Sequence, residues 1–172
     1  MKLLLVVDGL EAASLEPADC WLSDLSARLA ARGHRVTAVC TRPADAAQPP
    51  ESPAGVTVRR PPPGGLAAAL ESAFAQAPDV VHLSVTGALD EVSVGLLRGA
   101  PLLVDMHDFS AICANGDLVP RPDGGLCALH HPHANCGPCA GLSRLRAIDG
   151  RFRLAREAQA VVAHSAFARD RA

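Results

Sequence analysis

The sequence predicts an α/β fold, a Rossmann-like parallel sheet with helices on both faces. Two observations support it. Short apolar runs of strand length recur along the chain, and longer stretches with apolar residues at helical spacing lie between them. Strands that alternate with helices pair in parallel through right-handed crossovers. With 172 residues, 49% of them hydrophobic, the chain can bury the core of one domain. We expect that domain over residues 1–172, with a cysteine-rich insertion over residues 110–140.

The first half of the chain alternates between strands and a helix. The helix begins at Pro17, because the first turn does not need a backbone N–H, and it ends before Gly33, a residue type common just past a helix. Its apolar face carries Ala18, Leu22, Leu25 and Leu29. The expected strands are Lys2–Val7, Arg35–Cys40 and Val56–Val58.

The second half continues this alternation. The break Pro61–Gly65 precedes a helix whose apolar face carries Leu66, Leu70 and Phe74. Strands are expected over Asp79–Leu83, Leu102–Asp105 and Ala160–Ala163, with a short helix over residues 89–98. A last helix has an apolar stripe of Leu145, Ile148, Phe152 and Ala155, and we expect Arg144, Arg146, Arg151 and Arg153 on its solvated side.

Charge and hydropathy exclude several classes of partner. The net charge is −2 and no long basic run occurs, so we expect no nucleic-acid partner. No stretch approaches the roughly twenty apolar residues of a membrane span. The apolar start, Leu3–Val7, is shorter than the roughly seven residues that a signal peptide needs. We therefore predict a cytoplasmic chain, and peripheral membrane contact through the arginine-rich helix stays open.

The insertion holds four of the six cysteines, Cys113, Cys127, Cys136 and Cys139. Clustered cysteines in a reducing cytoplasm favour metal binding over disulfides, and four thiolates suit a closed, structural Zn²⁺ site. An iron–sulfur cluster, disulfides and free thiols are the alternatives, and His130, His131 or His133 would be a substitute ligand. Cys20 and Cys40 fit buried positions in a helix and a strand.

Polar residues follow two of the predicted strands. His107 and Asp108 come after the strand Leu102–Asp105, and His82 lies near the end of Asp79–Leu83. The carboxyl ends of parallel strands form the ligand crevice of such folds, so these residues are site candidates. The alternatives are strand-end histidines bonded to backbone and an aspartate that caps a loop. Ser165 is either a helix N-cap or part of an anion site at a helix N-terminus.

Several segments in this order resemble the N-terminal domain of a family 4 glycosyltransferase of the GT-B architecture. Besides the first strand they are Leu25–Val36, Asp79–His82, Val104–Phe109 and Val161–Arg169. Some members of that family also carry cysteines after the His-Asp-Phe segment. The resemblance implies a single GT-B half, in which His107 contacts the transferred sugar and His82, Asp108 and Ser165 bind substrate.

The resemblance also implies a hexosyltransferase-type activity shared between two domains. The N-terminal domain binds the acceptor, and a C-terminal domain or separately encoded subunit binds the nucleotide sugar. We expect the isolated chain to be inactive. Two departures favour the alternative of a non-catalytic binding module. Glu16–Pro17 replaces the Gly-Gly of the family, and in its His-x-His pattern His82 is followed by Ser84. Proline lacks the N–H and the conformational freedom that a close approach to diphosphate needs.

Overall fold

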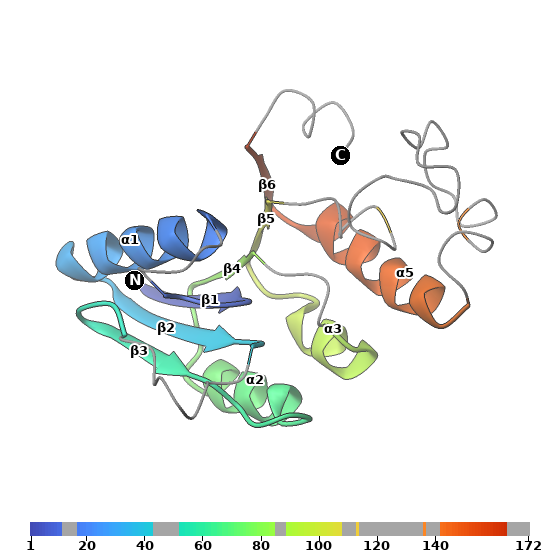
Figure 1. The fold of residues 1–172 in the computed structure, drawn as a ribbon, viewed down its shortest axis with the longest axis horizontal. Helices are drawn as coiled ribbons and strands as arrows, with labels where there is room; N and C mark the ends of the chain where they lie inside the picture. Colours follow the sequence, from blue (N-terminus) through green and yellow to red (C-terminus); the bar gives the residue numbers. More distant parts are fainter. Residues whose placement is uncertain are drawn as a thin grey trace.

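The computed structural model describes residues 1–11, 17–42, 52–84, 89–107, 113, 136 and 142–164. Within them, six strands form one sheet in the order β3-β2-β1-β4-β5-β6, and all neighbouring strands pair in parallel (Figure 1). The strands are β1 (Lys2–Val7), β2 (Arg35–Cys40), β3 (Val56–Arg59), β4 (Val80–Leu83), β5 (Leu102–Met106) and β6 (Ala160–Ala163). The strand order reverses between β1 and β4, and ligands bind at such a reversal in open α/β sheets.

Helices cover both faces of this sheet, which confirms the predicted Rossmann-like α/β fold. The described helices are α1 (Pro17–Ala31), α2 (Leu66–Phe74), α3 (Glu91–Leu97) and α5 (Leu142–Glu157). Leu22 of α1 packs with β1 and β2 on one face. Leu70 of α2, Leu97 of α3 and Leu154 of α5 pack in a separate cluster on the other face. Figure 1 shows α1 and α2 on opposite sides of the sheet.

The central strand β1 explains why the core has two halves. Its side chains alternate, so Leu4 and Val6 enter the cluster of α2, α3 and α5, whereas Leu5 and Val7 enter the cluster of α1. All four are buried. A strand buried on both faces reads as a continuous apolar run, which is the pattern that predicted it.

Local signals set the ends of α1 and α3. Pro17 begins α1 as predicted, and Gly33 follows it at a φ of +84°, a conformation that glycine adopts without strain. The helix predicted over residues 89–98 is shorter, Glu91–Leu97. It begins there because the Asp90 side chain accepts a hydrogen bond from the Ser93 amide at 2.8 Å, which also lowers the pKa of Asp90.

Helix α5 corrects one expectation. Arg151, predicted on the solvated side, is buried, together with Ile148 and Leu154. The buried face is therefore rotated from the predicted stripe. At 5% exposure the guanidinium of Arg151 is buried together with its aliphatic stem, which a count of apolar residues could not predict. Among the described residues, no helix is both long and apolar enough to cross a membrane.

Candidate functional site

Three histidines surround one buried aspartate at the carboxyl ends of β4, β5 and β6. Asp105 lies on β5, and His107 follows that strand directly. His82 lies on β4, and His164 comes directly after β6. Both neighbours of β5 run parallel to it, so the carboxyl ends of the three strands lie at one edge of the sheet. We call these four residues the histidine cluster.

The histidines share the two oxygens of the Asp105 carboxylate. Nε2 of His82 lies 3.1 Å from Oδ2, and Nε2 of His164 lies 2.5 Å from Oδ1, both as hydrogen bonds. Nε2 of His107 also lies 3.1 Å from Oδ2. This third contact meets the distance of an ion pair but not the geometry of a hydrogen bond. Nε2 of His107 is therefore buried without a hydrogen-bond partner among the described residues.

The carboxylate of Asp105 is held in its ionised form. Burial of its side chain would raise the pKa, but the contacts with His107, His82 and His164 outweigh burial and hold the pKa of Asp105 well below its usual range. An ionised carboxylate only accepts hydrogen bonds, so His82 and His164 each donate a hydrogen bond from Nε2–H. Asp105 therefore fixes the orientation of both rings.

Trp21 from α1 forms one wall of the histidine cluster. Its ring meets those of His107 and His164 edge-on, with centroids 5.3 Å apart in each case, and that of His82 at 6.3 Å. The rings of His107 and His164 stack on each other at 4.2 Å. Trp21 is the one tryptophan of the chain and is 41% exposed, so a ligand at the cluster would touch an indole that solvent also reaches.

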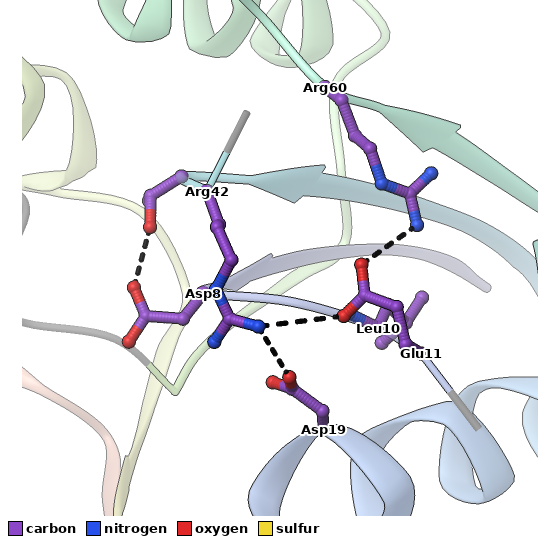
Figure 2. Close-up of polar contacts among 7 residues, drawn as sticks. Asp8, Leu10, Glu11, Asp19, Arg42 and Arg60 are labelled. Atoms are coloured by element: carbon purple, nitrogen blue, oxygen red, sulfur yellow. Dashed lines mark hydrogen bonds and ion pairs between the residues drawn. The ribbon is translucent and has the colours of Figure 1, made fainter. Parts of the chain in front are cut away.

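A second polar group lies at the carboxyl ends of β1 and β2. Figure 2 shows the guanidinium of Arg42 between Asp19 and Glu11, with Nη1 at 2.9 and 3.8 Å from their carboxylate oxygens. Arg60 Nη2 lies 3.5 Å from the other oxygen of Glu11, and Asp8 accepts a hydrogen bond from Thr41. We call this group the β1 network.

The side chains of the β1 network pass close to the backbone at Gly9. A Cβ at Gly9 would lie 2.4 Å from Oε2 of Glu11 and 2.7 Å from Oδ2 of Asp19. The network therefore occupies the space beside the β1–α1 turn, where a Rossmann-like fold can admit a phosphate. Its three carboxylates, of Asp8, Glu11 and Asp19, exceed the two guanidinium groups, so a diphosphate would meet net negative charge there.

Residues 22–172 match the model of the glycosyl transferase 4-like domain. The chain belongs to this family. No curated protein matches it. The match begins after β1, so Trp21 and the acidic residues of the β1 network precede the matched region, while all four residues of the histidine cluster lie within it.

In this glycosyl transferase 4-like domain, the structure brings two predicted site residues together. His82 and His107 meet at Asp105. Asp108 and Ser165 lie outside the described residues. Of the predicted zinc ligands, Cys113 and Cys136 are half-buried, and Cys127 and Cys139 are outside the described residues, so the four-cysteine site stays a prediction. Cys40 is fully buried as expected, but Cys20 is only half-buried.

The sequence did not predict Asp105, His164 or Trp21 as residues of the candidate site. Asp105 comes two residues before His107 at the end of β5, a spacing that places two side chains on one face of an extended backbone, and this spacing was available as a signal. His164 follows the last predicted strand, the same position that marked His107. Nothing in the sequence pointed to Trp21, because its place opposite the histidines depends on how α1 crosses the sheet.

A cavity of about 310 Å³ lies elsewhere in the domain, between α3 and α5. Acidic and basic side chains line it, among them Asp90, Asp149 and Arg153, and none of the described residues that line it is a histidine or a cysteine. It is lined by residues of α3 and α5, and it contains none of the residues singled out by the family resemblance. We therefore place the candidate site at the histidine cluster.

Proposed function

We propose that this domain is the acceptor side of a glycosyltransferase and acts with a donor-binding domain to transfer a sugar from a nucleotide sugar. The observation that carries the proposal is the histidine cluster at the carboxyl edge of a parallel sheet in a glycosyl transferase 4-like domain. Such edges hold the ligand crevice of open α/β folds. The proposed compartment is the cytoplasm, where clustered cysteines favour metal binding over disulfides.

The cluster supplies directed hydrogen-bonding groups and no evident nucleophile. Asp105 is buried and engaged by its histidines, so it serves to orient them. The rings of His107 and His164 are partly exposed and able to hydrogen-bond to sugar hydroxyls. In the proposed reaction, His107 contacts the transferred sugar and positions it, and His82, Asp108 and Ser165 contribute to substrate binding.

The need for a second domain follows from charge. The leaving diphosphate must be stabilised by cations or by preorganised N–H groups. At the β1–α1 turn this chain presents the β1 network, which is acidic overall, and Arg42 is already paired with Asp19. We therefore assign diphosphate binding to a separate domain, either from a longer form of this chain or from a separately encoded subunit.

A transfer assay tests this proposal. The purified chain is incubated with radiolabelled uridine and guanosine diphosphate sugars, alone and together with the donor-binding domain that its own or a neighbouring coding sequence specifies. We expect transfer only with both domains present, and a loss of roughly 100-fold with His107→Asn because the sugar is then misplaced. His34→Asn is the control, since His34 precedes β2 at the opposite edge of the sheet. Transfer by the chain alone would refute the division of labour.

One observation favours a second function, a binding module without chemistry. The β1 network, which is acidic overall, lies at the start of the segment between β1 and α1, and in the sequence of that segment Glu16–Pro17 replace the glycines of the family. If that segment no longer contacts a nucleotide sugar, this chain together with a donor-binding domain will transfer no sugar. The chain will still bind its ligand at Trp21. Quenching of Trp21 fluorescence by a saccharide, unchanged in His107→Asn and without transfer in any pairing, would support the module.

A further inference from the structure

We propose that Asp105, His107 and His164 form a binding site for a divalent transition-metal ion of the Zn²⁺ class. The inference goes beyond the proposed glycosyl transfer and does not rest on it. One ligand atom from each of the three residues can be chosen so that all lie within 4.8 Å of one another. In a tetrahedral zinc site with bonds of 2.0–2.1 Å, ligand atoms lie roughly 3.3 Å apart. Binding would replace the hydrogen bond between His164 and Asp105, so that the imidazole of His164 turns toward the ion and releases the proton of its ligating nitrogen to solvent.

The ligand types suit such an ion. Two imidazoles and one carboxylate form a donor set that zinc and other divalent ions of the same series accept, and it leaves one or more positions open. All the ligand atoms come from the neighbouring strands β5 and β6 or the residues directly after them. The paired strands hold Asp105 opposite Val162 and Met106 opposite Ala163. This register sets the distance between the backbones of β5 and β6, which carry the ligands, before an ion binds.

An orphaned atom points to the same place. Nε2 of His107 is buried, lies 3.1 Å from Oδ2 of Asp105, and makes no hydrogen bond to any described residue. A buried polar nitrogen without a partner costs roughly 1–3 kcal/mol. A cation between His107 and the carboxylate would give this nitrogen a partner, in the tautomer that leaves it unprotonated, and would also compensate the buried negative charge of Asp105.

Two neighbours would support the ion without binding it. His82 lies outside the ligand group and donates a hydrogen bond to Oδ2 of Asp105. Residues beyond the ligands of a metal site commonly orient a ligating carboxylate by such a hydrogen bond. Trp21 covers the imidazoles from α1 and supplies an apolar wall.

Titration with Co²⁺ tests the site on the complete chain. Trp21, as the one tryptophan, reports binding nearby, because a paramagnetic ion beside His107 and His164 quenches its fluorescence. We expect saturable quenching at one ion per chain, reversal by Zn²⁺, and visible bands of a Co²⁺ site with nitrogen and oxygen ligands. Asp105→Asn and His164→Gln should each weaken binding at least 100-fold. His82→Gln should weaken it about 10- to 100-fold, as loss of an outer partner does.

The controls separate this site from the cysteines. His34→Gln and Cys113→Ser should leave quenching unchanged. His164→Gln alters a ring that is 37% exposed, so its fold can be checked by circular dichroism and the variant remains informative if Asp105→Asn is unstable. Equal affinity in wild type and folded His164→Gln would overturn the proposal. So would the absence of saturable quenching, or a thiolate-to-cobalt band that Cys113→Ser abolishes together with all binding.

Discussion

Asp105→Asn removes the charge at the centre of the histidine cluster and keeps the shape of the side chain. In the wild type the buried carboxylate accepts from His82 and His164, and His107 lies at ion-pair distance. Asparagine keeps one acceptor oxygen and presents an NH₂ in place of the other. That NH₂ faces a ring nitrogen that already carries a proton, so donor meets donor.

The size of the effect follows from these contacts. A hydrogen bond to a charged group contributes roughly 1.5–3 kcal/mol, and asparagine retains one of the two in a weaker, neutral form. The His164 side chain is 37% exposed, so solvent screening reduces its share. We expect the free energy of unfolding to fall by about 2–4 kcal/mol at neutral pH, measured by urea titration followed at Trp21.

The loss of unfolding free energy in Asp105→Asn should shrink at low pH. The folded-state pKa of Asp105 lies below its ordinary value of 3.8, so the ionised carboxylate contributes stability above that pH and loses it as the pH falls toward the folded pKa. Asparagine does not titrate. The difference in unfolding free energy between wild type and variant is therefore fully present above roughly pH 5, and it shrinks below about pH 3.8.

Asp24→Asn is the matched control for this substitution. Asp24 is 63% exposed and pairs with Arg28 on the surface of α1, so we expect a change within about 0.5 kcal/mol. A loss in Asp105→Asn no larger than in Asp24→Asn would refute the reasoning about the cluster. A difference from wild type that grows as the pH falls below about 3.8 would refute its electrostatic part.

Three further outcomes can be measured by urea titration. Gly9→Ala should destabilise the chain by up to about 1 kcal/mol, because its Cβ would displace the ends of the Glu11 and Asp19 side chains, whose oxygens lie 2.4 and 2.7 Å away, whereas Gly95→Ala in α3, with nothing within 4 Å, should gain up to about 1 kcal/mol; equal effects would contradict this. Burial raises the pKa of the Cys40 thiol to about 11 from 9.0, so stability should fall by about 3 kcal/mol between these pH values, and Cys40→Ala should remove that fall. Gly150→Ala would place its Cβ 3.1 Å from Val94, a contact that offsets the gain of up to about 1 kcal/mol that alanine brings to a helix; Val94→Ala in the same chain should relieve the contact, and strict additivity of the two substitutions would argue against it.

The elements of this protein were readable from local patterns. The strands Lys2–Val7, Arg35–Cys40 and Ala160–Ala163 have the bounds that their apolar runs predicted, and Pro17 begins its helix. These signals act between residues close in sequence, through side-chain alternation and backbone freedom, so no tertiary information is needed to read them. The alternation of strands and helices likewise determined the fold class, because parallel strands require crossovers.

The histidine cluster was decided only by the tertiary structure. His82, Asp105 and His164 are far apart in the sequence and meet because β4, β5 and β6 are neighbours in the sheet. Strand order depends on which apolar faces pack together across the whole domain, and no local pattern encodes it. Trp21 reaches the cluster from α1 for the same reason, and Arg151 is buried because the packing of α5, rather than its residue types, sets its inward face.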